Sequence, residues 1–123
     1  MKLHSLQSQD HYLVSSYGPD WVSIKGQRYE RSLLLLPDHI DPAWGPARGE
    51  ALSAAHFEAL ASLSGHVILL GTGVRQHFPP VSLLRPLLVA GLAVEAMDTG
   101  AACRTFNILV GEGRAVAAAL VVE

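Results

Sequence analysis

The sequence has one cysteine, few aromatic residues and few charges, and each scarcity excludes a class of protein. A single cysteine, Cys103, excludes an intramolecular disulfide and favours a reducing compartment. Only 16% of the 123 residues are charged and half are hydrophobic, which excludes an intrinsically disordered chain. Aromatic residues make up 7%, too few for the stacking platform of a single-stranded nucleic-acid binder.

Long apolar runs and a strong charge bias are also missing. No stretch approaches the roughly 20 apolar residues that cross a bilayer, and the N-terminus lacks the apolar run of a signal peptide. The net charge is −2, and the nine basic residues are scattered from Lys2 to Arg114 rather than gathered into a stripe. The sequence therefore predicts a soluble, cytoplasmic, single domain over residues 1–123, without membrane insertion and without nucleic acid as its main partner.

The first third of the chain is predicted to be β-structure. Short runs rich in Val, Ile, Tyr and Trp predict strands over residues 11–17, 21–25 and 27–31, separated by the turn signals Gly18-Pro19-Asp20 and Gly26. The nearly continuous apolar run 32–36 is typical of a strand covered on both faces. Residues 38–50 are expected to form an ordered loop, with Ile40 and Trp44 turned inward as anchors.

From Ser53, a plausible helix N-cap, the hydrophobic period becomes helical. The pattern predicts helices over residues 53–63, 82–90 and 99–110, alternating with strands over residues 66–70, 93–97 and 115–122. The second helix should turn Leu84, Leu87 and Leu88 inward, and Pro86 should make it begin late or with a distorted first turn. This alternation predicts an α/β sheet covered by helices, with a right-handed parallel crossover between residues 66 and 97.

The first candidate site is the G-T-G loop formed by Gly71, Thr72 and Gly73. It follows a strand, which is where open α/β sheets bind ligands, and glycines let backbone N–H groups approach an anion. The spacing matches neither standard phosphate motif, because the third glycine and the Lys-Ser/Thr pair are missing. A tight turn at a strand end is therefore the favoured interpretation.

The densest group of polar residues lies in residues 97–107 and 112–114. Asp98 or Thr99 can cap the third helix by accepting from its free N–H groups. The helical step spaces two sets of residues on opposite sides of that helix. The set expected to face the core is Ala102, Phe106 and Leu109, and the opposite set is Arg104, Asn107 and Gly111.

Three interpretations of this polar group remain open. It is a solvated surface, an internal network that braces the helix, or a cleft for a small polar ligand. The network would include Arg104, Asn107, Glu95, Asp98, Glu112 and Arg114. The cleft would lie where residues 71–75 meet residues 97–104, with Arg75 and Arg104 as cations beside the helix N-terminus.

No catalytic or metal-binding set can be assembled from the sequence. Cys103 lies in the first turns of the third predicted helix, where the dipole can lower a thiol pKa, but a lone cysteine between alanines is more typical of a buried apolar residue. The six histidines lack metal-ligand spacing, and neither a G-x-S-x-G elbow nor a Ser/His/Asp set is recognisable. No metal, no cofactor and no enzymatic activity are therefore expected.

The run E-x-M-D-T-x-x-A-C-R-T-F-N at residues 95–107, with E-G-R at 112–114 and the G-T-G loop, resembles a known family. It is the domain-of-unknown-function family that includes mitochondrial complex I assembly factor 3 and the adipogenesis-associated domain-containing protein. Tyr29-x-x-Ser32 and the tryptophan of the 38–50 loop extend the resemblance over nearly the whole chain.

The resemblance implies a three-layer α/β fold. A central mixed sheet, with one central strand antiparallel to the others, would carry helices on one face and a small β layer with a helix on the other. The resemblance implies no established activity, cofactor or catalytic residue. The mitochondrial members act by binding proteins during assembly of the respiratory NADH dehydrogenase.

Two functional hypotheses follow. The first is a non-enzymatic protein-interaction domain, of the assembly-factor or chaperone-like kind, with an exposed apolar patch or a homodimer face around Trp44 and the 72–80 loop. The second is a small-molecule or anion-binding protein, or an enzyme, that uses the cleft described above.

Overall fold

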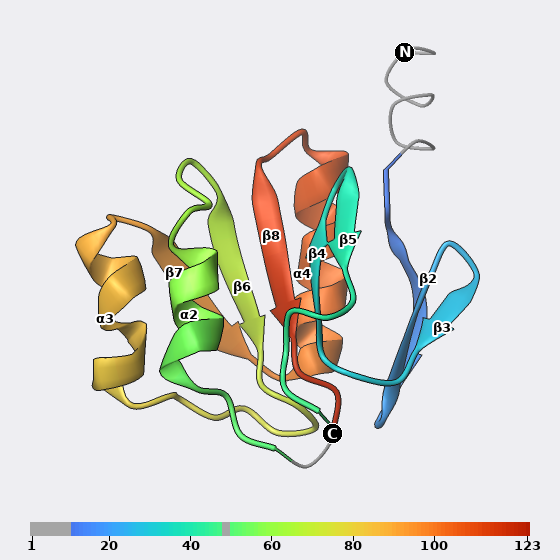
Figure 1. The fold of residues 1–123 in the computed structure, drawn as a ribbon. Helices are drawn as coiled ribbons and strands as arrows, with labels where there is room; N and C mark the ends of the chain where they lie inside the picture. Colours follow the sequence, from blue (N-terminus) through green and yellow to red (C-terminus); the bar gives the residue numbers. More distant parts are fainter. Residues whose placement is uncertain (1–10, 48–49) are drawn as a thin grey trace.

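The computed structural model describes residues 11–47 and 50–123, which form two β-sheets and three helices (Figure 1). The small sheet has the strand order β1-β2-β3, with β1 at Val14–Gly18, β2 at Trp21–Ile24 and β3 at Gln27–Tyr29. The central sheet has the order β5-β4-β8-β6-β7. Its strands are β4 (Leu33–Leu36), β5 (His39–Asp41), β6 (Val67–Gly71), β7 (Ala93–Met97) and β8 (Val116–Leu120). The helices are α2 (Ala54–Leu60), α3 (Val81–Val89) and α4 (Thr99–Gly111).

The central sheet is mixed. β8, β6 and β7 run parallel, and β4 is antiparallel to both of its neighbours, β8 and β5. The antiparallel strand implied by the family resemblance is therefore β4. The predicted parallel crossover from β6 to β7 is also confirmed, and α3 lies within it.

Two hydrophobic cores lie on the two faces of this sheet, because successive side chains of a strand point to opposite faces. Leu33, Leu35 and Leu69 pack toward α4 and the small sheet, whereas Leu34 and Ile68 pack toward α2 and α3. Figure 1 shows the resulting layers, with α2 and α3 on one side and α4 with β1–β3 on the other. The predicted three-layer fold is confirmed.

The 38–50 segment is more ordered than the sequence suggested. Residues His39–Asp41 form β5, which pairs with β4, so the prediction of a loop was wrong over these three residues. These residues are extended because they pair with the edge of β4, and their own sequence shows no hydrophobic period that would predict a strand. Trp44 is a buried anchor, as predicted, and its indole N–H donates to the carbonyl of His56 at 3.0 Å.

Helix α2 begins after Ser53, as predicted, but ends at Leu60 rather than residue 63. The Nδ1 atom of His56 accepts a hydrogen bond from the backbone N–H of Ser53 at 2.9 Å, which ties the first turn together. Phe57 and Leu60 are fully buried and direct this helix toward the core, whereas Ala54 is exposed.

Helix α3 departs from its prediction in two ways. It begins at Val81 and contains Pro86, because Leu83 and Leu84 already donate to the carbonyl of Pro80 and form the first turn ahead of that proline. Leu88 is 54% exposed, although it was predicted to face inward. The inward direction is set by Leu87, which is fully buried, and Leu88 lies about 100° further round the helix. Within the described ranges, no helix has the length and apolar character needed to cross a membrane.

Candidate functional site

The carboxyl ends of β6, β7 and β8 bring the two predicted site segments, residues 71–75 and 97–104, into direct contact. The backbone N–H of Thr72 donates to the carbonyl of Met97, and that of Thr99 donates to the carbonyl of Gly73, both at 2.8 Å. The N–H of Val121 donates to the carbonyl of Gly71 at 2.9 Å. The segment after each parallel strand is thus hydrogen-bonded to the segment after its neighbour.

Two buried threonine hydroxyls reinforce this junction. Thr99 Oγ1 accepts from the N–H of Gly73 at 2.8 Å and donates to the carbonyl of Val121 at 2.7 Å. Thr72 Oγ1 accepts from the N–H of His77 at 3.0 Å and lies 2.6 Å from the carbonyl oxygen of Arg75. Both hydroxyls are therefore engaged inside the protein and are poor candidates for contact with a ligand.

The G-T-G loop is a tight turn whose donors are already used. The N–H groups of Thr72 and Gly73 have the partners given above, and the N–H of Val74 donates to the Glu123 carboxylate at 2.7 Å. Gly73 has a φ of +99°, which favours glycine, and a phosphate would have to displace three existing hydrogen bonds. The geometry supports the turn interpretation over the phosphate one.

The N-terminus of α4 is capped by Asp98, which resolves the choice between Asp98 and Thr99. A carboxylate oxygen of Asp98 accepts from the N–H of Ala101 at 2.8 Å, and Thr99 is the first helical residue. The carboxylate also complements the positive end of the helix dipole. An external anion would therefore meet a negative charge at this helix end.

A hollow of about 260 Å³ nevertheless lies beside this capped end, at the place where the ligand cleft was predicted. Its lining residues come from three segments and are Tyr17, Gly18, Pro19, Gly73, Val74, Asp98, Thr99, Gly100 and Arg104. Arg104 is exposed at its rim, and one guanidinium N–H donates to the hydroxyl of Tyr17. Arg75, the second predicted cation, is absent from the lining. One guanidinium and one carboxylate in the same hollow suit a small polar molecule better than a simple anion.

Tyr17, Gly18 and Pro19, from the end of β1 and the turn after it, were not among the candidate site residues predicted from the sequence. Tyr17 and Arg104 are 87 positions apart, and their contact depends on how the small sheet sits on α4. Gly100 allows the small sheet to pack this closely against α4, because a Cβ at this position would come within 2.7 Å of the Tyr17 ring. The turn signal Gly18-Pro19 was visible, but it carried no indication of which helix it would meet.

Asn107 is not a solvated residue of the outer helix face. Its side-chain oxygen accepts from the backbone N–H of Val14 at 2.9 Å, and its side-chain nitrogen donates to the carbonyl of the same residue at 2.8 Å. The side-chain amide thus forms hydrogen bonds with both the N–H and the carbonyl of Val14 at the edge of β1, as the backbone of a neighbouring strand would. Asn107 fastens α4 to the small sheet.

The ion-pair network, one of the three interpretations left open by the sequence, is not formed among residues 11–47 and 50–123. Among the described residues, the recorded partner of Arg104 is Tyr17, and neither Glu95 nor Glu112 is paired with it. Glu112 follows Arg104 by eight residues, which is roughly 12 Å along a helix. Glu95 projects from β7 into solvent, and Glu112 and Arg114 are exposed after the end of α4. These three residues do not meet the hollow.

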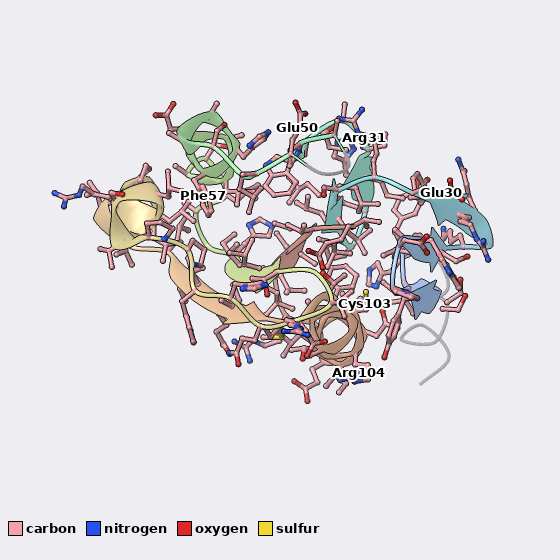
Figure 2. All side chains as sticks on the ribbon, turned by 90° about the horizontal axis from the view of Figure 1, so that it is seen from below. Glu30, Arg31, Glu50, Phe57, Cys103 and Arg104 are labelled. Atoms are coloured by element: carbon pink, nitrogen blue, oxygen red, sulfur yellow. The ribbon has the colours of Figure 1, made fainter. Side chains whose placement is uncertain are left out.

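Cys103 faces the core rather than solvent, as Figure 2 shows on the inner side of α4, with Arg104 on the outer side. Burial raises the pKa of the Cys103 thiol to about 12, the nearby Arg104 charge lowers it, and Asp98 raises it slightly. A nucleophilic cysteine needs the opposite shift. Over residues 11–47 and 50–123, no group of three or more potential ligands that could hold a metal ion is found.

A second concave surface lies at the same end of the sheet, on the side of α2 and α3. This groove has a volume of about 320 Å³ and a mostly apolar lining. Its residues are Glu50, Ala51, Leu52, Thr72, His77, Pro79, Pro80, Leu83, Val121 and Glu123. The 72–80 loop thus contributes to an apolar surface, as predicted, whereas Trp44 does not, because its ring is buried.

The groove continues into a neighbouring hollow of about 280 Å³. The two share Glu50, Ala51, Val121 and Glu123, so together they form one furrow past the end of β8. Figure 2, which looks along the strands from their carboxyl ends, places Glu50 and Arg104 at opposite margins of the molecule. The furrow and the hollow beside Arg104 are therefore separate surfaces.

Comparison with known proteins identifies relatives of the whole domain. A family model for a protein of unknown function (DUF498/DUF598) matches residues 14–121. The NADH dehydrogenase (ubiquinone) 1 alpha subcomplex assembly factor 3 of Xenopus tropicalis is 40% identical over 116 residues, 93% of this chain and 63% of that protein. The 13 kDa major membrane protein of Francisella tularensis is 31% identical over 72 residues, 58% of each. The chain spans about three fifths of the length of these curated relatives.

The fold is shared with solved structures. A crystal structure of a Bordetella parapertussis protein superposes with a TM-score of 0.81 at 36% identity, and covers 92% of this chain and 97% of that one. The similarity therefore covers nearly the whole of both chains.

Proposed function

The chain belongs to the DUF498/DUF598 family of proteins of unknown function, and from this premise we propose that it is a non-enzymatic protein-binding domain of the assembly-factor kind. The observation that carries the proposal is the apolar furrow at the carboxyl ends of β6 and β8. The similarity to a protein named as an assembly factor supports this class of function. The proposal adopts only this class of function from the relative and names no particular complex as the partner.

The furrow suits an extended protein segment better than a compact metabolite. Its apolar part is formed by Leu52, Pro79, Pro80 and Leu83, which can receive an apolar side chain, and His77 beside them adds one imidazole. The carboxylates of Glu50 and Glu123 lie where the two halves join, so they would meet the backbone or a basic side chain of a bound segment.

Two further observations favour binding over catalysis. The thiol of Cys103, which the sequence placed near a helix N-terminus as a candidate nucleophile, is buried and its pKa is raised. The loop that would hold a phosphate has its backbone donors occupied. Each group therefore already has a structural role that a reaction would have to undo.

The test places a photo-crosslinking residue at Ala51, which is exposed within the furrow, and a control at Ile108, which is exposed on α4. In the native cells, position 51 should crosslink to a defined protein and position 108 should not. The variant Ala51→Arg, which fills the furrow without touching the core, should release that protein in affinity purification, whereas Ile108→Arg should retain it. A partner set that is irreproducible, or unchanged by Ala51→Arg, would refute the proposal.

A second candidate function is binding of a small polar molecule in the hollow beside Arg104. The observation that favours it is the concavity itself, with a guanidinium and a carboxylate on its wall. Titration with pools of polar metabolites, followed by backbone chemical shifts, should perturb Gly73, Gly100 and their neighbours in the wild type. Arg104→Ala should abolish the perturbation, and spectra that stay unchanged across all pools would reject this function.

A further inference from the structure

The outer face of α3 is apolar, although it is turned away from the core. Val81 is 67% exposed, Leu88 54% and Val89 81%, whereas Leu87 on the inner face is fully buried. The helical step places Val81 and Leu88 nearly in line, two turns apart, with Val89 about 100° from Leu88. A helix that is apolar on both faces is normally covered on both faces.

Most of the exposed large hydrophobic residues lie in one part of the chain. Of the seven large hydrophobic residues that are exposed among the described residues, five lie between Val74 and Val89. They include Phe78, which precedes α3 and is 77% exposed. None of Phe78, Val81, Leu88 and Val89 lines the furrow assigned above to a protein partner. The outer face of α3 is therefore a surface of its own.

The charges on this part of the chain are of one sign. Residues 59–94 contain no Asp or Glu, although the whole sequence has eleven acidic residues. Within the same stretch, Arg75 and Arg85 are exposed, and Arg85 lies on the outer face of α3 about 40° from Val81. Glu58 and Glu95 belong to the neighbouring elements α2 and β7, so the basic character is local to α3 and the loop before it.

We propose that the outer face of α3, with Phe78 before it, binds the surface of an anionic lipid bilayer. Valine, leucine and phenylalanine side chains would enter the boundary between headgroups and acyl chains, as in helices that lie in the interfacial plane. Arg85 would keep its aliphatic stem among them and extend its guanidinium to the headgroup phosphates. Since α3 and the loop before it carry no carboxylate, the nearest acidic residues in the sequence being Glu58 on α2 and Glu95 on β7, little repulsion from an anionic surface arises on this face.

The experiment is co-sedimentation of the intact protein with vesicles of phosphatidylcholine, with or without about 30% phosphatidylglycerol. The wild type should bind the vesicles that contain phosphatidylglycerol and should bind phosphatidylcholine alone much less. The double variant Val81→Ser/Leu88→Ser should weaken this binding by about tenfold, because the inserted apolar area is lost. Arg85→Glu should weaken it by about fivefold or more.

Ile108→Ser is the matched control, because Ile108 is 60% exposed but stands on α4, on the other face of the sheet. It should bind as the wild type does, and thermal melting should show that all variants are folded. Wild-type protein that stays in the supernatant with phosphatidylglycerol vesicles would overturn the proposal. So would self-association that Val81→Ser/Leu88→Ser abolishes without any vesicle binding, since the face would then be an interface between copies. Neither result would affect crosslinking from Ala51, which tests the protein-binding furrow separately.

Discussion

Helices α4 and α3 lie on opposite faces of the central sheet, and the segments that contain them use their side chains in opposite ways. Residues 97–107 hold most of the polar groups that looked like a site, and their hydrogen bonds are made within the protein. Residues 74–89 hold little recognisable chemistry, yet they supply five exposed large hydrophobic residues and one wall of the furrow. The contrast separates a region whose polar groups brace the fold from a region whose apolar side chains remain exposed.

The difference teaches that a cluster of polar residues in a sequence can serve to satisfy backbone hydrogen bonds and need not mark a site of chemistry. At the ends of three adjacent parallel strands, backbone groups lose their strand partners and need others. Thr72 and Thr99 meet that demand here, and Asp98 meets the corresponding demand of the first turn of α4. Along α3 itself the backbone groups bond mainly within the helix, so the unusual feature of this helix is its exposed apolar surface.

The largest expected effect comes from Thr99→Val, which keeps the shape of the side chain and removes its hydroxyl. The N–H of Gly73 and the carbonyl of Val121 would lose their buried partner, at a cost of about 2–4 kcal/mol in the free energy of unfolding. Urea denaturation measures this. Thr105→Val, on the same helix but without a recorded cross-element hydrogen bond, should change stability by less than about 0.5 kcal/mol. Equal losses from the two variants would contradict the bracing role.

A somewhat smaller effect is expected from Asn107→Asp. Aspartate can still accept from the N–H of Val14, but it cannot donate to the Val14 carbonyl and would place a negative oxygen against it. The free energy of unfolding should fall by about 1–3 kcal/mol. A solvated asparagine would tolerate this change. A denaturation midpoint equal to that of the wild type would therefore show that Asn107 does not stabilise the contact with β1. Hydrogen exchange should show the loosening first at β1.

The elements of the fold were largely predictable because local patterns specify them. β7 has the predicted bounds, and α4 begins at the predicted Thr99, since Asp98 is a strong capping residue and the apolar period that follows is regular. β5 was missed because three residues are too few to show a period. The inward face of α3 was misjudged at Leu88 because a helix that is apolar all round does not reveal its direction.

The candidate site was only partly predictable. Strand order brings residues 71–75 and 97–104 together, and this follows from a parallel crossover. The contacts of Tyr17 with Arg104 and of Val14 with Asn107 span 87 and 93 positions and depend on the seating of a second sheet. Arg104 and Asn107 are alike in sequence, as polar residues on one side of a helix. Only the neighbouring sheet makes one a brace and leaves the other at the rim of a hollow.

Cys103 gives a prediction about pH on the bracing side of the sheet. Its thiol pKa is raised from 9.0 to about 12 in the folded protein, mainly by burial. Below pH 9 the thiol is protonated in both states, whereas above it the unfolded chain loses the proton that the folded chain keeps. The free energy of unfolding should therefore fall with rising pH, by up to about 1.4 kcal/mol per pH unit from this group.

The measurement compares urea denaturation of the wild type and Cys103→Ala between pH 8 and pH 10, since the titration of lysines and tyrosines is common to both. The stability difference between the two proteins should change by about 1 kcal/mol over this range, to the disadvantage of the wild type at high pH. If the free energies of unfolding of the two proteins changed with pH in parallel, the thiol would ionise as readily in the folded as in the unfolded protein. Cys103 would then again be a candidate reactive group.

The smallest effect is expected from Arg104→Ala, and it sharpens the boundary between bracing and binding. Arg104 is exposed, and its guanidinium lies 5.9 Å from the centroid of the Tyr17 ring besides donating to the hydroxyl. An exposed contact of this kind contributes less than about 1 kcal/mol, so thermal stability should fall only slightly, and close to the effect of Arg114→Ala. A loss as large as that of Asn107→Asp would place Arg104 among the braces and close the hollow as a candidate site. A small loss combined with loss of metabolite-induced chemical shifts would assign Arg104 to ligand binding rather than to bracing.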